Sequence, residues 1–256
     1  MIERRGRPEG RRRGVALLPS LFTTGNLFLG FWAIVKALHG QYGEAAPLLG
    51  WAIILDMADG RIARLTGTTS EFGGELDSLA DAISFGVAPA LLAYLWAFSS
   101  LPRLGWIAAF VFLMCGVFRL ARFNVQRHSV DGRYFVGLPI PAAAAQVAAL
   151  IHFDPDPITL KAQAVMIVAL LLTLALLMVS TMRYHSFKGI DLRKRRSYIT
   201  VVGFLMLLLP IVAFPEYALL LLASAYAVSG PTNHLWGILR RRGTAPPGAL
   251  AAGEAR

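Results

Sequence analysis

Apolar stretches of similar length recur along the chain and are separated by short polar or helix-breaking segments. They cover residues 20–39, 44–65, 78–99, 104–125, 138–153, 158–182, 198–214 and 216–238. Most of them approach the roughly 17–25 residues that a helix needs to cross a membrane. Glycine and proline mark the breaks between them, at Gly40, Pro102, Pro155 and Pro215. The pattern predicts an all-α membrane bundle of about eight transmembrane helices. Six or seven remain possible, because 138–153 is short and carries Pro139 and Pro141, and because the break at 210–215 is ambiguous.

Composition supports a membrane protein. The chain has 256 residues, of which 56% are hydrophobic, and a mean hydropathy of +0.57, which soluble domains rarely reach. Its net charge of +10 is not arranged as a basic stripe interleaved with aromatic residues, so the sequence argues against a nucleic-acid partner. Cys115 is the only cysteine, which excludes a disulfide within the chain.

The distribution of positive charge predicts the orientation in the membrane. If both termini lie on one side, all but three of the 25 Lys and Arg residues fall on that side. The exceptions are Lys36, Arg103 and Lys161. The positive-inside rule then places both termini at the cytoplasmic face, which requires an even number of spans.

No internal repeat or second domain is visible. We expect a basic cytoplasmic N-terminal segment over 1–19, one membrane domain over 20–238, and a basic, disordered cytoplasmic tail over 239–256.

Four carboxylates stand close together in this apolar chain. Asp56 and Asp59 are spaced i, i+3, whereas Asp77 and Asp81 are spaced i, i+4, so each pair lies on one helix face. Ionised groups are expensive within membrane spans and are usually functional there. Four uncompensated carboxylates would repel one another, but an all-oxygen cluster suits Mg²⁺ or Mn²⁺. The cluster therefore indicates a metal-dependent enzyme.

Other interpretations of the cluster are possible. Asp56 and Asp59 could be capping or solvated residues where the second span leaves the membrane. Asp77 could cap the third span, and Asp81 could pair with Arg64. A cation transporter would also need acids in the membrane, but these acids gather at the cytoplasmic ends of two adjacent spans. A lipid-binding scaffold would have no need for a general base.

The acids belong to a longer pattern of fixed spacing, Asp56-x₂-Asp59-Gly60-x₂-Ala63-Arg64-x₈-Gly73-x₃-Asp77-x₃-Asp81. This pattern resembles the signature of the CDP-alcohol phosphatidyltransferases, with every position filled. The resemblance implies that Asp56, Asp59 and Asp77 hold a divalent metal. It also implies that Asp81 is the general base and can touch the metal. It assigns the pocket for the CDP moiety to Gly60, Ala63, Arg64 and Gly73.

Four stretches extend the resemblance over most of residues 15–190, and they are nearest to the branch of the family that makes phosphatidylserine. These are residues 19–27, 77–89, 119–124 and 137–144. The resemblance implies transfer of a phosphatidyl group from CDP-diacylglycerol to L-serine by a homodimer in the cell membrane, with the site at the cytoplasmic face. A sister enzyme that uses glycerol 3-phosphate, inositol phosphate or choline remains the alternative.

Polar residues outside the signature offer further candidate contacts. Thr23 and Asn26 could hydrogen-bond the cytosine of CDP, or they could cap a helix. Arg119 and Arg122 could form a two-guanidinium clamp for the serine carboxylate or a lipid phosphate, or they could lie at the lipid interface. Arg133 follows in the next loop as a further candidate for the acceptor.

Overall fold

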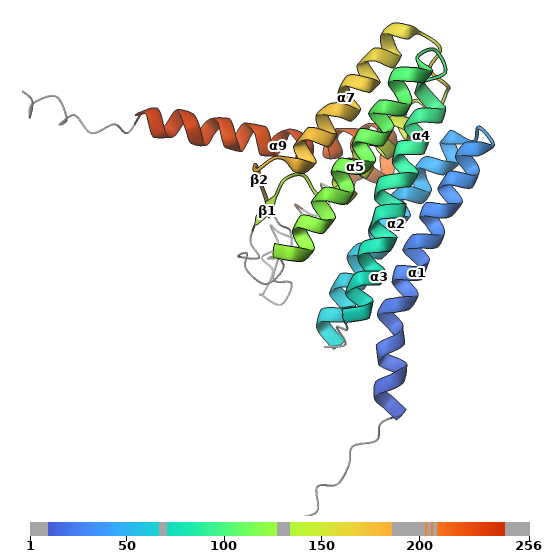
Figure 1. Ribbon diagram of the computed structural model, residues 1–256, viewed down its shortest axis with the longest axis vertical. Coiled ribbons are helices and arrows are strands. Elements are labelled where there is room, and N and C mark those ends of the chain that lie inside the picture. The colour runs from blue at the N-terminus through green and yellow to red at the C-terminus, as the bar shows by residue number, and fades with distance from the viewer. Residues whose placement is uncertain are drawn as a thin grey trace, which may run out of the picture.

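The computed structural model describes residues 10–66, 71–126, 134–185, 203, 206 and 209–243. Its elements, in chain order, are α1 (Gly10–Leu38), α2 (Tyr42–Thr66), α3 (Glu71–Asp81), the π-helical turn η1 (Ala82–Val87), α4 (Ala88–Ala97), α5 (Pro102–Gln126), β1 (Tyr134–Val136), α6 (Ile140–Phe153), α7 (Lys161–Val179), β2 (Arg183–His185) and α9 (Pro215–Gly243). α3, η1 and α4 follow one another without a break, so they form one long helical rod (Figure 1).

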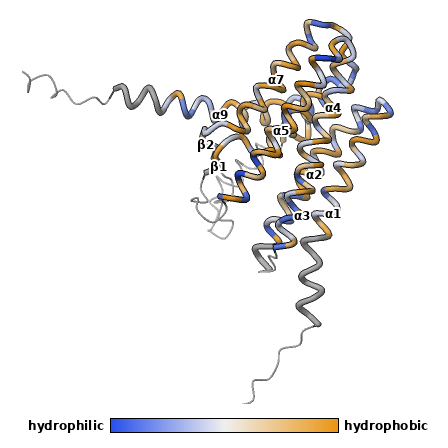
Figure 2. The backbone as a smooth tube through the Cα atoms, in the orientation of Figure 1, coloured by the Kyte–Doolittle hydropathy of each residue, from blue (hydrophilic) through white to orange (hydrophobic). Residues whose placement is uncertain are grey.

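The long helices run alongside one another, and α9 runs across them (Figure 1). Within the described residues, four helical segments are long and apolar enough to cross a membrane. They are Leu21–Leu38, Glu71–Ala97, Pro102–Gln126 and Lys161–Val179. Figure 2 shows hydrophobic residues along the middle of these helices and hydrophilic residues toward their ends. The predicted helical membrane protein is therefore confirmed.

Three of the predicted spans, which correspond to α2, α6 and α9, do not pass the same criterion. α2 carries Asp56, Asp59 and Arg61 near its end, so the carboxylates of the signature themselves lower its hydropathy. α6 has only 14 residues and is apolar but short. Most of the predicted span 198–214 lies outside the described residues. The exact number of spans stays a prediction.

One small sheet departs from the all-α prediction. β1 pairs antiparallel with β2, and Phe135 lies opposite Tyr184. The sheet joins the start of α6 to the segment after α7. Gly137 follows β1 with a φ of +80°, and a Cβ at that position would lie 3.0 Å from the carbonyl oxygen of Ser180. A residue other than glycine would be strained here, both by the backbone angle and by this close approach.

The prolines near α6 start the helix and do not kink it. Pro139 is the N-cap residue, and Pro141 lies in the first turn, where its missing N–H group costs no helical hydrogen bond. At the opposite end of the bundle, Gly40 ends α1 with a φ of +73°. The amide groups of Gly40 and Gln41 donate to the carbonyl groups of Ala37 and Lys36, as in a Schellman motif.

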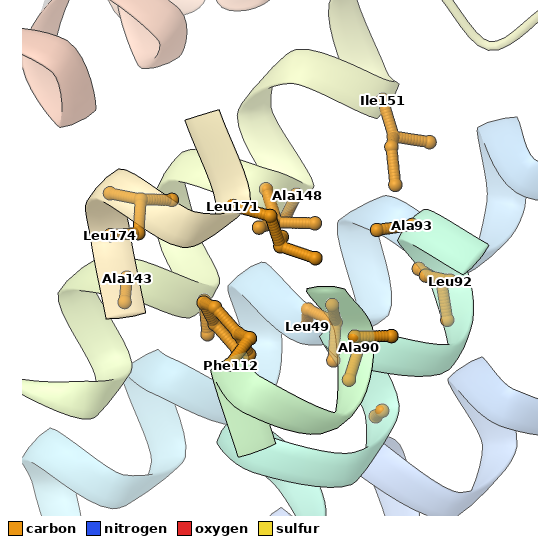
Figure 3. Close-up of a cluster of buried hydrophobic side chains, with 14 of the residues drawn as sticks. Leu49, Ala90, Leu92, Ala93, Phe112, Ala143, Ala148, Ile151, Leu171 and Leu174 are labelled. Carbon is orange, nitrogen blue, oxygen red and sulfur yellow. The ribbon is translucent and has the colours of Figure 1, made fainter. Parts of the chain in front are cut away.

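The core of the bundle is built from alanine, branched aliphatic and aromatic side chains contributed by α2, α4, α5, α6 and α7 (Figure 3). Leu49, Phe112 and Leu171 are examples, and each is buried. Ile140 fills the space left by Gly116, where a Cβ would come within 2.6 Å of the Ile140 Cδ1 atom. Small residues thus let α5 and α6 approach closely, which is how helices pack in membranes.

Candidate active site

Three of the four predicted carboxylates meet between α2 and α3. Asp56 on α2 and Asp77 and Asp81 on α3 each offer one oxygen atom, and these oxygens all lie within 4.8 Å of one another. α3 supplies two of them because residues at i and i+4 lie on one helix face. The set consists of oxygen donors alone and is half-buried, so it fits a hard divalent cation such as Mg²⁺ or Mn²⁺.

Asp59 lies outside this group of three oxygens and has a different partner. Its side chain is 6% exposed, and its carboxylate accepts a hydrogen bond from the hydroxyl of Thr23 on α1. Residues at i and i+3 differ by about 60° around the helix axis, so Asp56 and Asp59 can face different neighbours. The sequence predicted one cluster of four acids, whereas the structure forms a group of three with Asp59 tethered to α1. The ligand role of Asp59 stays a prediction.

Asp81 is oriented by Asn26, which also lies on α1. The Asn26 Nδ2 atom donates to Asp81 Oδ1 over 3.3 Å. Asn26 is fully buried, and its backbone carbonyl oxygen accepts a hydrogen bond of 3.1 Å from the Ser84 hydroxyl. The two residues predicted to contact cytosine, Thr23 and Asn26, therefore both engage carboxylates of the signature. This arrangement favours a role in holding the acids, and the cytosine contact stays a prediction.

The turn that follows Asp81 is π-helical. η1 places Ser84 directly against Gly30 of α1, where a Cβ would lie 2.7 Å from the Ser84 Cα atom. Single π turns inside helices are rare overall, and many of those that occur lie at functional sites. Here the turn brings the backbone of the long rod close to α1, next to the Asn26–Asp81 hydrogen bond.

Arg119 and Arg122 do not form the predicted pair. Arg119 is 8% exposed, lies 5.7 Å from the ring centroid of Phe123, and interacts electrostatically with Asp81 and Asp56. Arg122 donates from Nη1 to the carbonyl oxygen of Val179, at the end of α7, over 3.3 Å. Only Arg119 therefore belongs to the carboxylate site, because the two guanidinium groups have different partners.

The structure describes the surroundings of the other predicted residues only in part. Gly60 is exposed, and a Cβ there would meet no atom within 4 Å, so the space beside it is open. Ala63 and Arg64 lie on α2, but their side chains fall outside the described part of the structure. Gly73 lies in the first turn of α3 and is half-buried. Arg133 lies outside the described residues.

Two contacts near the site were not predicted from the sequence. Asn124, near the end of α5, donates from Nδ2 to the Ser78 hydroxyl over 2.9 Å, and Ser78 donates to the Gly74 carbonyl over 3.0 Å. These bonds fix α3, and with it Asp77, against α5. Tyr226 of α9 interacts electrostatically with Arg119. The adjacency of Ser78 to Asp77 is the only sequence signal for the first contact, and nothing in the sequence indicates the second.

Comparison with known proteins identifies the family of the chain. Residues 16–184 match the CDP-alcohol phosphatidyltransferase family. The chain belongs to this family. The match begins within α1 and continues past the end of α7, so it includes every carboxylate of the site, whereas α9 lies beyond it.

Curated relatives share one printed name, CDP-diacylglycerol–serine O-phosphatidyltransferase. A relative from Helicobacter pylori (strain ATCC 700392 / 26695) is 42% identical over 175 residues, which cover 68% of this chain and 74% of the relative. A relative from Bacillus subtilis (strain 168) is 34% identical over 171 residues, covering 67% and 91%. A relative from Methanocaldococcus jannaschii is 35% identical over 225 residues, covering 88% and 98%.

Proposed function

We propose that this CDP-alcohol phosphatidyltransferase transfers the phosphatidyl group of CDP-diacylglycerol to the hydroxyl of L-serine, releasing phosphatidylserine and CMP in phospholipid biosynthesis. The observation that carries the choice of acceptor is the shared name of relatives from distant organisms, one of which aligns with 88% of this chain. The observation that supports the chemistry is the half-buried group of Asp56, Asp77 and Asp81.

The carboxylates are suited to hold a divalent cation, Mg²⁺ or Mn²⁺. Asp56, Asp77 and Asp81 offer the three converging oxygens, and Asp59 is a candidate fourth ligand after rotation away from Thr23. A bound cation would neutralise negative charge on the pyrophosphate and on the departing CMP phosphate. The donor set contains no sulfur or nitrogen ligand, which disfavours softer metals.

Asp81 is our candidate for the general base. In the reaction the serine hydroxyl oxygen bonds to the phosphorus that carries the diacylglycerol, and the bond from this phosphorus to the CMP phosphate oxygen breaks. An alcohol is too weak an acid to ionise unaided at neutral pH, so a carboxylate within hydrogen-bond reach must accept its proton. Asn26 donates to one Asp81 oxygen, Oδ1, and thereby fixes the direction of the other.

The remaining residues of the signature would bind the two substrates. We expect Gly60, Ala63 and Gly73 to leave room for the CDP moiety, and the space beside Gly60 is open. Arg64 would be suited to a phosphate oxygen. Arg119 is our candidate for the serine carboxylate, because it is the buried cation next to Asp81. Arg133 stays a candidate for the acceptor or for a lipid phosphate.

In the cell we expect an integral protein of the cytoplasmic membrane, with both termini and the active site at the cytoplasmic face. Residues 20–238 would form its membrane domain, flanked by the basic segments 1–19 and 239–256. We further expect an even number of spans, about eight, and a homodimer as in related enzymes. Support for the orientation comes from the loop charges.

An acceptor panel tests the proposal. Purified protein receives CDP-diacylglycerol with L-serine, glycerol 3-phosphate, inositol phosphate or choline, and CMP release is followed with each alcohol. We expect CMP release with serine, and loss of that release in EDTA with recovery on adding Mg²⁺ or Mn²⁺. Release with another alcohol but not serine would assign the chain to a sister activity. The absence of release with any alcohol would favour a non-enzymatic role such as cation transport.

A further inference from the structure

α3 carries two of the three converging acids, so its rotation about its own axis decides where their oxygens lie. It packs along α1, and a hydrogen bond reaches it from α5. Asn124, near the end of α5, donates from Nδ2 to the Ser78 hydroxyl over 2.9 Å, across 46 residues of sequence. Because Ser78 directly follows Asp77, this bond acts on the residue next to a candidate metal ligand.

The Ser78 hydroxyl serves both as a donor and as an acceptor. Its single proton is directed to the Gly74 carbonyl, one turn earlier in α3, over 3.0 Å. The hydroxyl oxygen can therefore serve Asn124 only as an acceptor, and Asn124 must offer its NH₂ group. The hydroxyl thus links the backbone of α3 to α5, and only a side chain with a donor at position 124 keeps this link.

A small rotation of α3 would disturb the group of acids. Successive residues point about 100° apart around a helix, so Ser78 can face α5 while Asp77 faces Asp56 of α2. Side-chain ends lie roughly 5–6 Å from the helix axis, so a rotation of about 10° moves them by about 1 Å. Mg²⁺ needs near-ideal octahedral geometry with oxygens at about 2.0–2.1 Å, which a shift of this size would spoil. The bond from Asn124 resists such a rotation.

We propose that Asn124 is a positioning residue that acts through Ser78 on Asp77 and thereby sets the affinity of the acids for a divalent cation. The proposal rests on the proposed function, because it takes these acids as the metal site. Replacing a direct hydrogen-bond partner of a metal ligand typically weakens metal binding by roughly 10- to 100-fold. Asn124 acts one residue further from the metal, so we expect a smaller loss, about 3- to 10-fold.

Two variants remove the bond, and a third provides a matched control. Asn124→Leu and Ser78→Ala each delete one partner without changing the charge of the site. Ser224→Ala also deletes a hydrogen bond between a serine hydroxyl and a side-chain amide of another helix, the 3.2 Å bond to Oε1 of Gln146. That bond joins α9 to α6 and involves none of the acids. Ser78→Thr keeps a hydroxyl that can make both bonds of Ser78.

Cation binding is measured on the full-length purified protein without substrate. Mn²⁺ is titrated into each variant, and the electron paramagnetic resonance signal of free Mn²⁺ gives its Kd. We expect Asn124→Leu and Ser78→Ala to raise this Kd about 3- to 10-fold. Ser78→Thr and Ser224→Ala should leave it unchanged. Thermal unfolding of each variant in detergent verifies that it is folded.

The double variant separates positioning from a general structural effect. If Asn124 acts through Ser78, Asn124→Leu and Ser78→Ala together should weaken Mn²⁺ binding little more than either substitution alone. Unchanged Kd in both single variants would overturn the proposal, as would an equal rise in Ser224→Ala or fully multiplicative effects in the double variant. Wild-type protein that binds no Mn²⁺ would instead refute the metal site of the proposed function, and this proposal with it.

Discussion

At the scale of residues, Asp81 has the environment expected of a base that must accept a proton from an alcohol. It lies one turn after Asp77, and its oxygen lies close to those of Asp56 and Asp77. It also accepts a hydrogen bond of 3.3 Å from the Asn26 amide. Arg119 supplies a positive charge nearby. The carboxylate is therefore fixed in direction before substrate binds, and such preorganisation lowers the cost of reaching the transition state. Arg119 offsets only part of the negative charge of the three neighbouring carboxylates.

Asp81→Asn tests this role. The amide keeps the shape and can still accept the Asn26 hydrogen bond, but it cannot take a proton from the acceptor. We expect kcat to fall by roughly 10²- to 10⁴-fold while the KM for CDP-diacylglycerol stays near its wild-type value. Steady-state kinetics of the purified variant measure both constants. Near-normal turnover would move the role of base elsewhere, and loss of nucleotide affinity together with turnover would mark Asp81 mainly as a metal ligand.

The two arginines of α5 should respond differently to replacement by lysine. Arg119→Lys removes the planar fork from the carboxylate site, so we expect the KM for serine to rise roughly 10- to 100-fold, equivalent to about 1.5–3 kcal/mol. Arg122→Lys alters only a 3.3 Å contact with the end of α7 and should leave the KM for serine unchanged. Kinetics with serine varied at saturating CDP-diacylglycerol provide the comparison. Equal effects of the two substitutions would restore the clamp predicted from the sequence.

Spacing along the chain predicted that Asp77 and Asp81 lie together, but it did not predict how each acid of the signature is held. The i, i+4 spacing of Asp77 and Asp81 on one helix fixes their common face, so their meeting follows from the sequence. The tether between Asp59 and Thr23 depends on how α1 docks against α2, over a separation of 36 residues. No local pattern contains that information. The same limitation applies to Tyr226, whose place depends on the packing of α9.

At the scale of elements, the site depends on how closely α1 approaches its neighbours. Gly25 faces Leu55 of α2, where a Cβ would lie 2.7 Å from the leucine Cδ2 atom, and Gly30 faces Ser84 in η1. These two glycines flank Asn26, so the close contact of α1 with α2 and η1 brings the amide within reach of Asp81. The apolar pattern predicted the helix over 20–39, but it did not predict the π turn, which lies where the rod packs against Gly30 of α1.

Two glycine-to-alanine substitutions test how closely α1 approaches η1. Gly30→Ala places a Cβ 2.7 Å from the Ser84 Cα atom, whereas Gly50→Ala on α2 meets no atom within 4 Å. We expect Gly30→Ala to lower the free energy of unfolding by about 1–3 kcal/mol through overpacking. Gly50→Ala should raise it by up to about 1 kcal/mol, because alanine favours the helix over glycine. Thermal unfolding in detergent measures both, and equal stability of the two variants would contradict the packing.

At the scale of the whole molecule, three cationic residues lie near one end of the bundle, and the carboxylate site lies toward the other end. Lys36 lies in the last turn of α1, and Arg103 and Lys161 lie in the first turns of α5 and α7. The α1–α2, α4–α5 and α6–α7 connections gather at one end (Figure 1). The carboxylates and Arg119 lie toward the other end of α2 and α5. The loop charges predict that the site lies on the side rich in Lys and Arg, and this orientation stays a prediction.

Cysteine labelling tests the orientation. In a Cys115→Ala background, Asp156→Cys introduces a thiol in the exposed α6–α7 segment, and Glu71→Cys introduces one at the exposed start of α3. A membrane-impermeant maleimide added to intact cells should label Asp156→Cys and spare Glu71→Cys until the cells are broken. The reverse pattern would place the active site outside the cell and would contradict the cytoplasmic assignment.

The most direct test of the central claim follows the serine oxygen atom. Purified protein receives CDP-diacylglycerol and L-serine carrying ¹⁸O in its hydroxyl, and the products are weighed by mass spectrometry. If the hydroxyl attacks the phosphorus that carries the diacylglycerol, all ¹⁸O should appear in phosphatidylserine and none in CMP. Labelled nucleotide, phosphatidylserine without ¹⁸O, or no phosphatidylserine at all would contradict transfer of the phosphatidyl group to the serine hydroxyl.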